Sequence, residues 1–290
     1  LLAGCGQVLN SAAAVSGAVP QISVVLGTCL GTNALNAASA DFVIMSEKAQ
    51  LSLDVTGENA SAEYNAEHGI ASVVAKDSAE AVAKAKELVL YLPSNNLNTA
   101  PESFEEEPAD CDCIVGSTVD GGSVYKLFDN YGKDAKVRLA RLGGSVVGIV
   151  KTNGGVLSCP ATTKIAKFVR FCDAFSLPIL TFVDCKGFES IKSAAKAASA
   201  YAEATTVKIS VVYGQAVGSG YIALAGTGAN ADMVYALPQA VISPVNVEAA
   251  AFILAADAMN VPVAEQKAVA EKFAAENLSA FNAAQNGYVD

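Results

Sequence analysis

Two stretches of the chain are almost alike, Ile22-Ser-Val-Val-Leu-Gly27-Thr-Cys-Leu-Gly31-Thr-Asn33 and Ile209-Ser-Val-Val-Tyr-Gly214-Gln-Ala-Val-Gly218-Ser-Gly220, at an offset of 187 residues. The likeness resumes downstream: residues 40–43 match 231–234 and residues 49–52 match 240–243, at an offset of 191 because the second copy has a four-residue insertion. Each copy has the pattern of a buried strand, a glycine turn, a small-residue helix and a further strand. The sequence therefore predicts a duplicated α/β unit.

The chain that leads into the second copy has its own regular pattern. Residues 136–141 and 145–150 flank Gly143-Gly144 and predict a β-hairpin. Thr162 or Thr163 is expected to cap a helix that ends before Pro178, and a strand over 179–183 and an Ala-rich helix over 191–204 follow. Only residues 1–21 precede the first copy, enough for the equivalent of that last helix, so we expect the chain to begin inside its first repeat.

The segment between the copies starts with a helix and ends with acidic residues. Asp77-Ser-Ala-Glu80 is a capping box that predicts a helix to about Leu90. Six acidic residues then surround two prolines, and we interpret them as a solvated linker in preference to an acidic binding tail: Glu102, Glu105, Glu106, Glu107, Asp110 and Asp112. We therefore predict a first domain remnant over 1–98, a linker over 99–112 and a second domain over 113–290.

The composition excludes several classes of protein. The 290 residues have a formal net charge of -10, which argues against a nucleic-acid partner, and 52% are hydrophobic, which excludes disorder. The first charged residue is Asp41, but polar residues and glycines interrupt the preceding stretch, so we expect neither a membrane anchor nor a secretory signal. Seven scattered cysteines do not suggest a disulfide framework, and they favour a reducing, cytoplasmic location.

Few side chains are available for catalysis. His68 is the only histidine, and we read it as an ordinary loop residue beside Gly69. Cys111 and Cys113 form a lone C-x-C pair, so we predict no metal site. The glycine turns offer another kind of chemistry, because backbone N–H groups at a helix start have no intrahelical partner and can bind an oxyanion. Glycines that merely permit close packing remain an equal alternative.

Several motifs, in order along nearly the whole chain, resemble one family. They are Val19-Pro-Gln-Ile-Ser-Val-Val, Gly27-x-Cys-x-Gly31, Ala40-Asp-Phe-Val-Ile-Met45, Tyr91-Leu-Pro-Ser-Asn-Asn96, Phe168-Val-Arg-Phe-Cys-Asp-Ala-Phe175, Leu180-Thr-Phe-Val-Asp184-x-x-Gly-Phe188, Gly218-x-Gly-Tyr-Ile-Ala223 and Gly287-Tyr-Val-Asp290. This set resembles the carboxyltransferase subunit of biotin-dependent acyl-CoA carboxylases and the alpha subunit of biotin-dependent decarboxylases. The resemblance implies an α/β fold of two crotonase-like ββα repeat domains, a ClpP/crotonase-like spiral, the first truncated at its N-terminus.

The resemblance also implies a mechanism and a site. A carboxyl group moves between carboxybiotin on a partner carrier and the α-carbon of an acyl-CoA, through enolates held by backbone N–H groups. By carry-over, the catalytic positions are Gly31 and Thr32 for the thioester and Ser219 and Gly220 for biotin. Further substrate-binding positions are Cys29, Gly218, Ile222, Gly187 and Phe188, although Ile222 could equally serve helix packing. Lys48, Arg138, Arg141 and Arg170 are available cations for CoA phosphates, and none of them is assigned.

The implied partners are a biotin carboxyl carrier, a biotin carboxylase subunit and further copies of the chain, as dimer pairs or a hexamer; a decarboxylase would add a membrane subunit. The chain departs from the family at Thr32, Asn246 and Ala249, where glycine is usual, and at Lys186, where proline is usual. The glycine- and His-containing stretch after the first copy is also shortened, to residues 57–69. A degenerate, non-catalytic CoA-binding scaffold is therefore the alternative. A hydratase or isomerase of the same superfold would need carboxylates near the first site, and Asp41 is expected to be structural, like Asp232.

Overall fold

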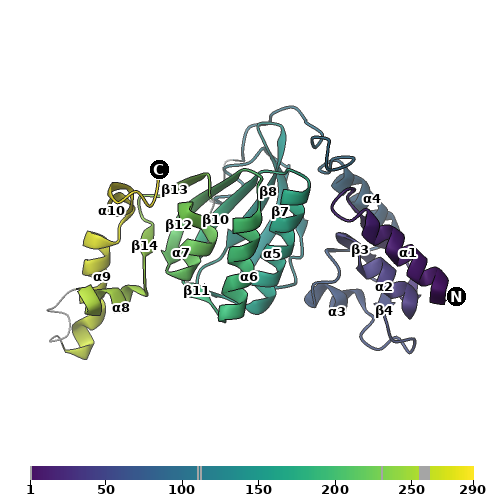
Figure 1. The fold of residues 1–290 in the computed structure, drawn as a ribbon, viewed down its shortest axis with the longest axis horizontal. Helices are drawn as coiled ribbons and strands as arrows, with labels where there is room; N and C mark the ends of the chain where they lie inside the picture. Colours follow the sequence, from purple (N-terminus) through teal and green to yellow (C-terminus); the bar gives the residue numbers. More distant parts are fainter. Residues whose placement is uncertain (1, 110, 112, 230, 255–261) are drawn as a thin grey trace. The chain divides into compact units, whose positions relative to one another are not determined.

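The computed structural model describes residues 2–109, 111, 113–229, 231–254 and 262–290. The chain divides into two compact units, which are described separately (Figure 1): unit 1 comprises Leu1–Lys133, Val137–Gly148 and Phe171–Leu177, and unit 2 comprises Asp134–Lys136, Ile149–Arg170 and Pro178–Asp290. The domain boundaries expected near residues 98 and 113 stay a prediction, and Asp110 and Asp112 of the acidic segment lie outside the described residues.

The first copy lies in unit 1. Strands β1, β3 and β5 form a parallel three-stranded sheet, and β2 and β4 form a second, two-stranded sheet. Strand β3 is buried along its whole length, because each of its residues packs into the core of the unit. The elements in order are α1 (Leu2–Ala14), β1 (Ile22–Val25), β2 (Thr28–Leu30), α2 (Thr32–Ala38), β3 (Phe42–Ser46), β4 (Gln50–Ser52), α3 (Ala62–Glu67) and β5 (Val73–Ala75).

The second copy lies in unit 2 and follows the same order. One long strand, β12, takes the places of β1 and β2, and it pairs with both β13 and β14. Two helices, α8 and α9, are present here and have no counterpart in the first copy. The elements are α6 (Ile191–Glu203), β12 (Lys208–Val217), α7 (Ser219–Leu224), a 3-10 turn η1 (Thr227–Ala229), β13 (Met233–Ala236), β14 (Val241–Ser243), α8 (Val247–Leu254), α9 (Val263–Asn277) and α10 (Ala280–Gln285).

The strand registers confirm the duplication. Ile22 pairs with Phe42 as Ile209 pairs with Met233, and the offsets of 187 and 191 residues are those found in the sequence. The two aspartates have the same role in both copies, since the Asp41 carboxylate accepts from the Gln21 N–H (2.8 Å) and the Asp232 carboxylate accepts from the Lys208 N–H (2.7 Å). Asp41 and Asp232 are thus structural, as expected.

The duplication also extends further than the sequence reading suggested. Gln50 bridges to Ser61 and Val241 bridges to Ser279, and each serine caps the helix that follows it. The copies end alike as well: the Val43 N–H donates to the Ser72 hydroxyl as the Val234 N–H donates to the Asp290 carboxylate. The offset here is 218 rather than 191, so the second copy has 27 more residues, which include α8 and α9.

Between the copies, the predicted hairpin is confirmed as β7 and β8, and the helix before Pro178 is confirmed with one correction. It begins at Cys159 and not after Thr162 or Thr163, because the Ser158 hydroxyl accepts from the Ala161 N–H and caps it. Helices α5 and α6 lie side by side (Figure 1), joined by an Arg170–Glu203 ion pair of 3.2 Å. The larger sheet has seven strands in the order β13-β12-β10-β8-β7-β6, with β14 also on β12. The elements are α4 (Ser78–Val89), β6 (Tyr125–Leu127), β7 (Ala135–Leu142), β8 (Ser145–Thr152), β9 (Val156–Leu157), α5 (Cys159–Ala174), β10 (Ile179–Cys185) and β11 (Gly187–Phe188).

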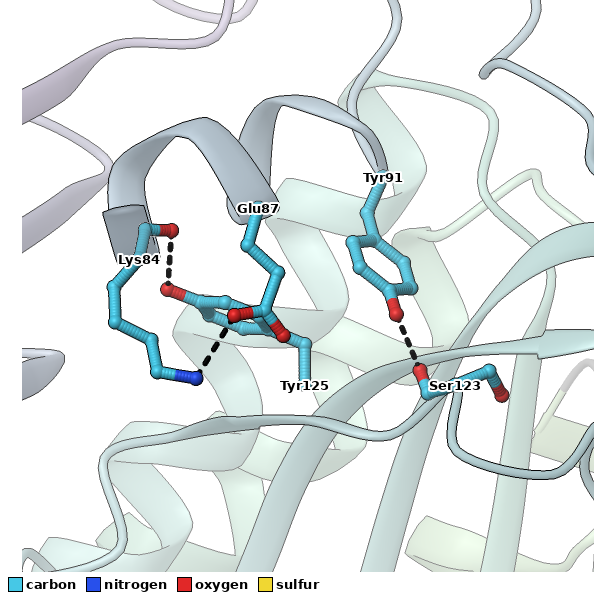
Figure 2. A network of polar contacts seen from close by, with 5 residues as sticks. All are labelled: Lys84, Glu87, Tyr91, Ser123 and Tyr125. Carbon is cyan, nitrogen blue, oxygen red and sulfur yellow. Dashed lines mark hydrogen bonds and ion pairs between the residues drawn. The ribbon is translucent and has the colours of Figure 1, made fainter. Parts of the chain in front are cut away.

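Helix α4 is capped as predicted and is held in unit 1 by two tyrosines (Figure 2). The Asp77 carboxylate accepts from the Glu80 N–H at 2.8 Å, which begins the helix. The Tyr125 hydroxyl donates to the Lys84 carbonyl (3.0 Å) and the Tyr91 hydroxyl donates to the Ser123 carbonyl (2.6 Å). Burial raises the pKa of both tyrosines, most strongly that of Tyr125. Both therefore stay neutral donors near pH 7.

The uncharged N-terminal stretch is now accounted for. It forms α1, β1, β2 and α2, the same elements that the second copy builds from α6, β12 and α7. None of the residues of α1 is buried in this chain. Of the helices in the described residues, none is long and apolar enough to cross a bilayer.

Candidate active site

The first glycine turn presents two free backbone donors at the start of α2. Gly31 is the residue before the helix, with φ 73°, and its N–H donates to the Ser52 carbonyl at 2.9 Å. The next two N–H groups, of Thr32 and Asn33, have no acceptor among the residues that the structure describes. They lie in the first turn of a helix, where N–H groups point out of the helix end and bind negative charge.

The second glycine turn is built in the same way at the start of α7. Gly218 has φ 51°, and its N–H donates to the Ser243 carbonyl at 2.8 Å. The N–H groups of Ser219 and Gly220 have no acceptor within the described part of the chain. Gly220 is required for packing, because an added Cβ would lie 3.0 Å from the carbonyl oxygen and Sγ of Cys185. Gly187 lies opposite, with its Cβ position 3.9 Å from the Ser219 hydroxyl.

The repeat relates the two donor pairs residue by residue. Gly31 corresponds to Gly218, Thr32 to Ser219 and Asn33 to Gly220. The predicted pairs, Gly31 with Thr32 and Ser219 with Gly220, are one position out of step with this relation. In the structure the Gly31 N–H is used in the strand connection, and Asn33 holds the second free donor. The offset of 187 was sufficient to identify Asn33, but the motif carry-over took precedence over it.

The non-glycine residue at Thr32 causes no backbone strain. Positive φ is needed at Gly31, one residue earlier, while Thr32 is already helical. Among the described residues, the positive φ values outside glycine belong to Asn59, Phe128 and Ser176, so Asn246 and Ala249 are not strained either. These three departures from the family pattern therefore leave the backbone of both turns intact.

The other expected contact residues lie around the two turns. Cys29 is half-buried in β2, two residues before Gly31, and Phe188 is half-buried in β11, where it pairs with Leu157. Ile222 follows the second donor pair and is 60% exposed, which makes helix packing a poor explanation for it. The sequence reading missed Cys5 of α1, whose Sγ lies 3.7 Å from the Thr32 hydroxyl oxygen and 3.5 Å from the Asn33 side-chain oxygen.

Most of the available cations already have partners. Arg141 donates to the carbonyl oxygens of Leu90, Pro101 and Gly144, at 2.7–2.8 Å. Arg138 and Arg170 form ion pairs with Asp129 and Glu203. Lys48 is exposed and lines a cavity of about 400 Å³ in unit 1, next to β4. It is thus the best placed of the four for an anionic group.

The remaining titratable candidates do not form a catalytic centre. His68 ends α3, stacks on the Tyr64 ring at 3.9 Å and contacts the Tyr64 carbonyl through Nδ1. All seven cysteines are free, and burial raises the pKa of Cys185 to about 11, so it stays a thiol. Within the described ranges, no group of three His, Cys, Asp or Glu side chains could hold a metal ion. The chemistry that remains is that of the backbone donors.

Comparison with known proteins gives a consistent result along the whole chain. Residues 1–290 match the family model described as the carboxyl transferase domain. The alpha subunit of methylmalonyl-CoA decarboxylase from Veillonella parvula is 32% identical over all of this chain and 65% of its own length. A putative propionyl-CoA carboxylase beta chain from Bacillus subtilis (strain 168) is 31% identical over all of this chain and 66% of its own.

A solved structure agrees. Transcarboxylase 12S, a hexamer crystallised with hydrolysed methylmalonyl-coenzyme A, superposes with a TM-score of 0.90 at 30% identity, over all of this chain and 65% of its own. This match confirms the predicted crotonase-like α/β fold. The chain spans about two thirds of the length of the relatives that it matches.

Proposed function

This chain belongs to the carboxyl transferase domain family, and on that basis we propose that it moves a carboxyl group between biotin and the α-carbon of an acyl-CoA. The observation that carries the proposal is the pair of equivalent turns, each with two free N–H groups at a helix start. Two such donors suit a carbonyl oxygen on which negative charge develops. The thioester oxygen of an acyl-CoA and the ureido oxygen of biotin are both oxygens of this kind.

The residues would share the work between the two copies. Thr32 and Asn33 would hold the thioester oxygen and stabilise the enolate that forms when the α-carbon loses its proton or carboxyl group. Ser219 and Gly220 would hold the ureido oxygen, beside Gly187 and Phe188. Carboxybiotin on a partner would supply the carboxyl group and, through its ureido nitrogen, the base. This division needs no catalytic side chain, which agrees with a chain that has one histidine.

The direction of transfer follows from the partners. With a biotin carboxyl carrier and a biotin carboxylase, in the cytoplasm, the same step carboxylates acyl-CoA. With a carrier and a membrane subunit, it decarboxylates a carboxyacyl-CoA, and the resemblance to the Veillonella parvula subunit favours keeping this second possibility. Further copies of the chain, as dimer pairs or a hexamer, are part of the proposal, and the exposed residues of α1 are available for such contacts.

The test is an exchange assay on the full-length protein. Labelled carboxyacyl-CoA is incubated with free biotin, and transfer of the label is measured together with CoA binding by calorimetry. The proposal expects both binding and transfer. Binding without transfer would support the non-catalytic scaffold instead, and neither binding nor transfer would reject both.

A further inference from the structure

The two copies differ most directly beside their donor pairs. After β14 the second copy continues into α8 and α9 before it reaches Ser279, whereas after β4 the first copy needs only residues 53–60 to reach Ser61. The first donor pair is therefore bordered by a short loop. We call residues 53–57 of this loop the lip.

The lip lies against the turn that holds the first donors. The Cγ1 atom of Val55 is 3.3 Å from the position that a Cβ on Gly31 would occupy. Gly57 is close as well, because its own Cβ position lies 3.9 Å from Leu30 of β2. Val55 is thus a side chain next to the residue that precedes Thr32 and Asn33.

Hydrogen bonds hold the lip in one conformation. At its tip, the Asp54 carboxylate accepts from the Thr56 N–H (2.8 Å), which lowers the Asp54 pKa, and the Gly57 N–H donates to the Asp54 carbonyl. At its base, the buried Asn65 amide donates to the carbonyl oxygens of Leu51, Ala60 and Ser61 at 2.9–3.1 Å. The lip therefore presents its side chains from a fixed frame.

The side chains that it presents are apolar and uncovered. Leu53 is 66% exposed and Val55 is 75% exposed, at positions where a polar loop residue would cost nothing. A carbonyl group bound at the Thr32 and Asn33 N–H groups would place its alkyl chain within a few bonds of Val55. An alkyl chain gains free energy when apolar side chains cover it, and a full covering of one methylene is worth roughly fourfold in affinity.

From these contacts we infer that Val55, with Leu53, contacts the acyl chain of the thioester and favours acyl-CoAs with an extended alkyl group over acetyl-CoA. The inference rests on the proposed function, since it places the thioester oxygen at the first donor pair. It assigns specificity to a loop that is independent of the second donor pair and of Ile222.

The test compares Val55→Thr with Val89→Thr in the full-length protein. Both valines are exposed, at 75% and 55%, but Val89 lies at the end of α4. The kcat/KM for carboxyl exchange is measured for acetyl-, propionyl- and butyryl-CoA. We expect wild type and Val89→Thr to gain up to roughly fourfold per methylene, and Val55→Thr to lose most of that gain without a change in the acetyl-CoA rate. Equal chain-length ratios in all three proteins would overturn the inference.

Two further outcomes separate this inference from the proposed function. If wild type exchanges no acyl-CoA, the proposed function fails, and calorimetric binding of the same three CoA thioesters still tests Val55 through the chain-length ratio. If Val55→Thr leaves the ratios unchanged and shifts the oligomeric mass in sedimentation experiments, the lip is a contact between copies and the inference is wrong.

Discussion

Replacing Thr32 with proline removes one backbone donor and almost nothing else. Thr32 is the first helical residue of α2, its N–H has no acceptor among the described residues, and proline is favoured at this position of a helix. The preceding Gly31 has ψ -148°, outside the helical region that a following proline disfavours. We therefore expect a folded protein, unlike a proline in a helix interior, which costs about 3 kcal/mol.

The expected loss is catalytic. Removal of one oxyanion donor costs roughly 100- to 1000-fold in kcat, or about 2.7–4 kcal/mol of barrier. Thr32→Ala is the matched control, because it loses the same hydroxyl and the same 3.7 Å contact with Cys5 but keeps the N–H. Exchange kinetics are measured with thermal unfolding of each variant. A folded Thr32→Pro protein with wild-type kcat would refute the assignment, and an equal loss in Thr32→Ala would transfer it to the hydroxyl.

Three further predictions concern stability. Gly220→Ala places a Cβ 3.0 Å from Cys185, and we expect unfolding to become easier by about 1–3 kcal/mol in urea titrations; an unchanged midpoint would mean that α7 shifts freely. Arg141→Lys loses the fork that joins three carbonyl oxygens and should cost about 1–3 kcal/mol by thermal denaturation, whereas Arg170→Lys at an exposed pair should cost under about 1. The raised pKa of Tyr125 means that the unfolded chain releases its proton first, so stability should fall as pH rises above about 10, and Tyr125→Phe should lower this alkaline sensitivity while costing about 1 kcal/mol at pH 7. Urea titrations at pH 8 and 11 measure both effects, and an equal alkaline loss in the two proteins would contradict the assignment to Tyr125.

The sequence was a good guide where local chemistry and repetition determine the structure. The duplicated strands, the Asp77 cap and the hairpin at Gly143-Gly144 all depend on short-range patterns, and the structure contains each of them. The start of α5 was misplaced because Thr162 is a good capping residue by type, yet Ser158 lies where the chain enters the helix. Capping depends on the backbone conformation at one residue, which residue type alone does not determine.

The candidate site shows a different limit. Which N–H groups are free depends on which strand partners the turn, and the Ser52 and Ser243 carbonyls decide this from more than 20 residues away. Likewise, the contact of Cys5 with Thr32 joins residues 27 positions apart, on two helices that the sequence does not relate. The difference of 27 residues beside the donor pairs was also hidden, because Ser61 and Ser279 can be aligned only once both are seen to cap a helix.

The geometry of the turns explains why a threonine can replace a glycine in an active site of this kind. The strained conformation and the close contact both fall on the residue before the donors: an added Cβ would meet Val55 at 3.3 Å from Gly31 and the Pro244 carbonyl at 3.0 Å from Gly218. The donor residues themselves are helical, and they contribute a main-chain group that every residue except proline has. Selection for the oxyanion turn therefore acts on Gly31 and Gly218 in both copies, while the side chains at Thr32, Asn33 and Ser219 are free to vary. Gly31→Ala should accordingly disrupt the first site more than Thr32→Ala, and the ratio of their exchange rates measures how far the turn, and not the side chain, carries the function.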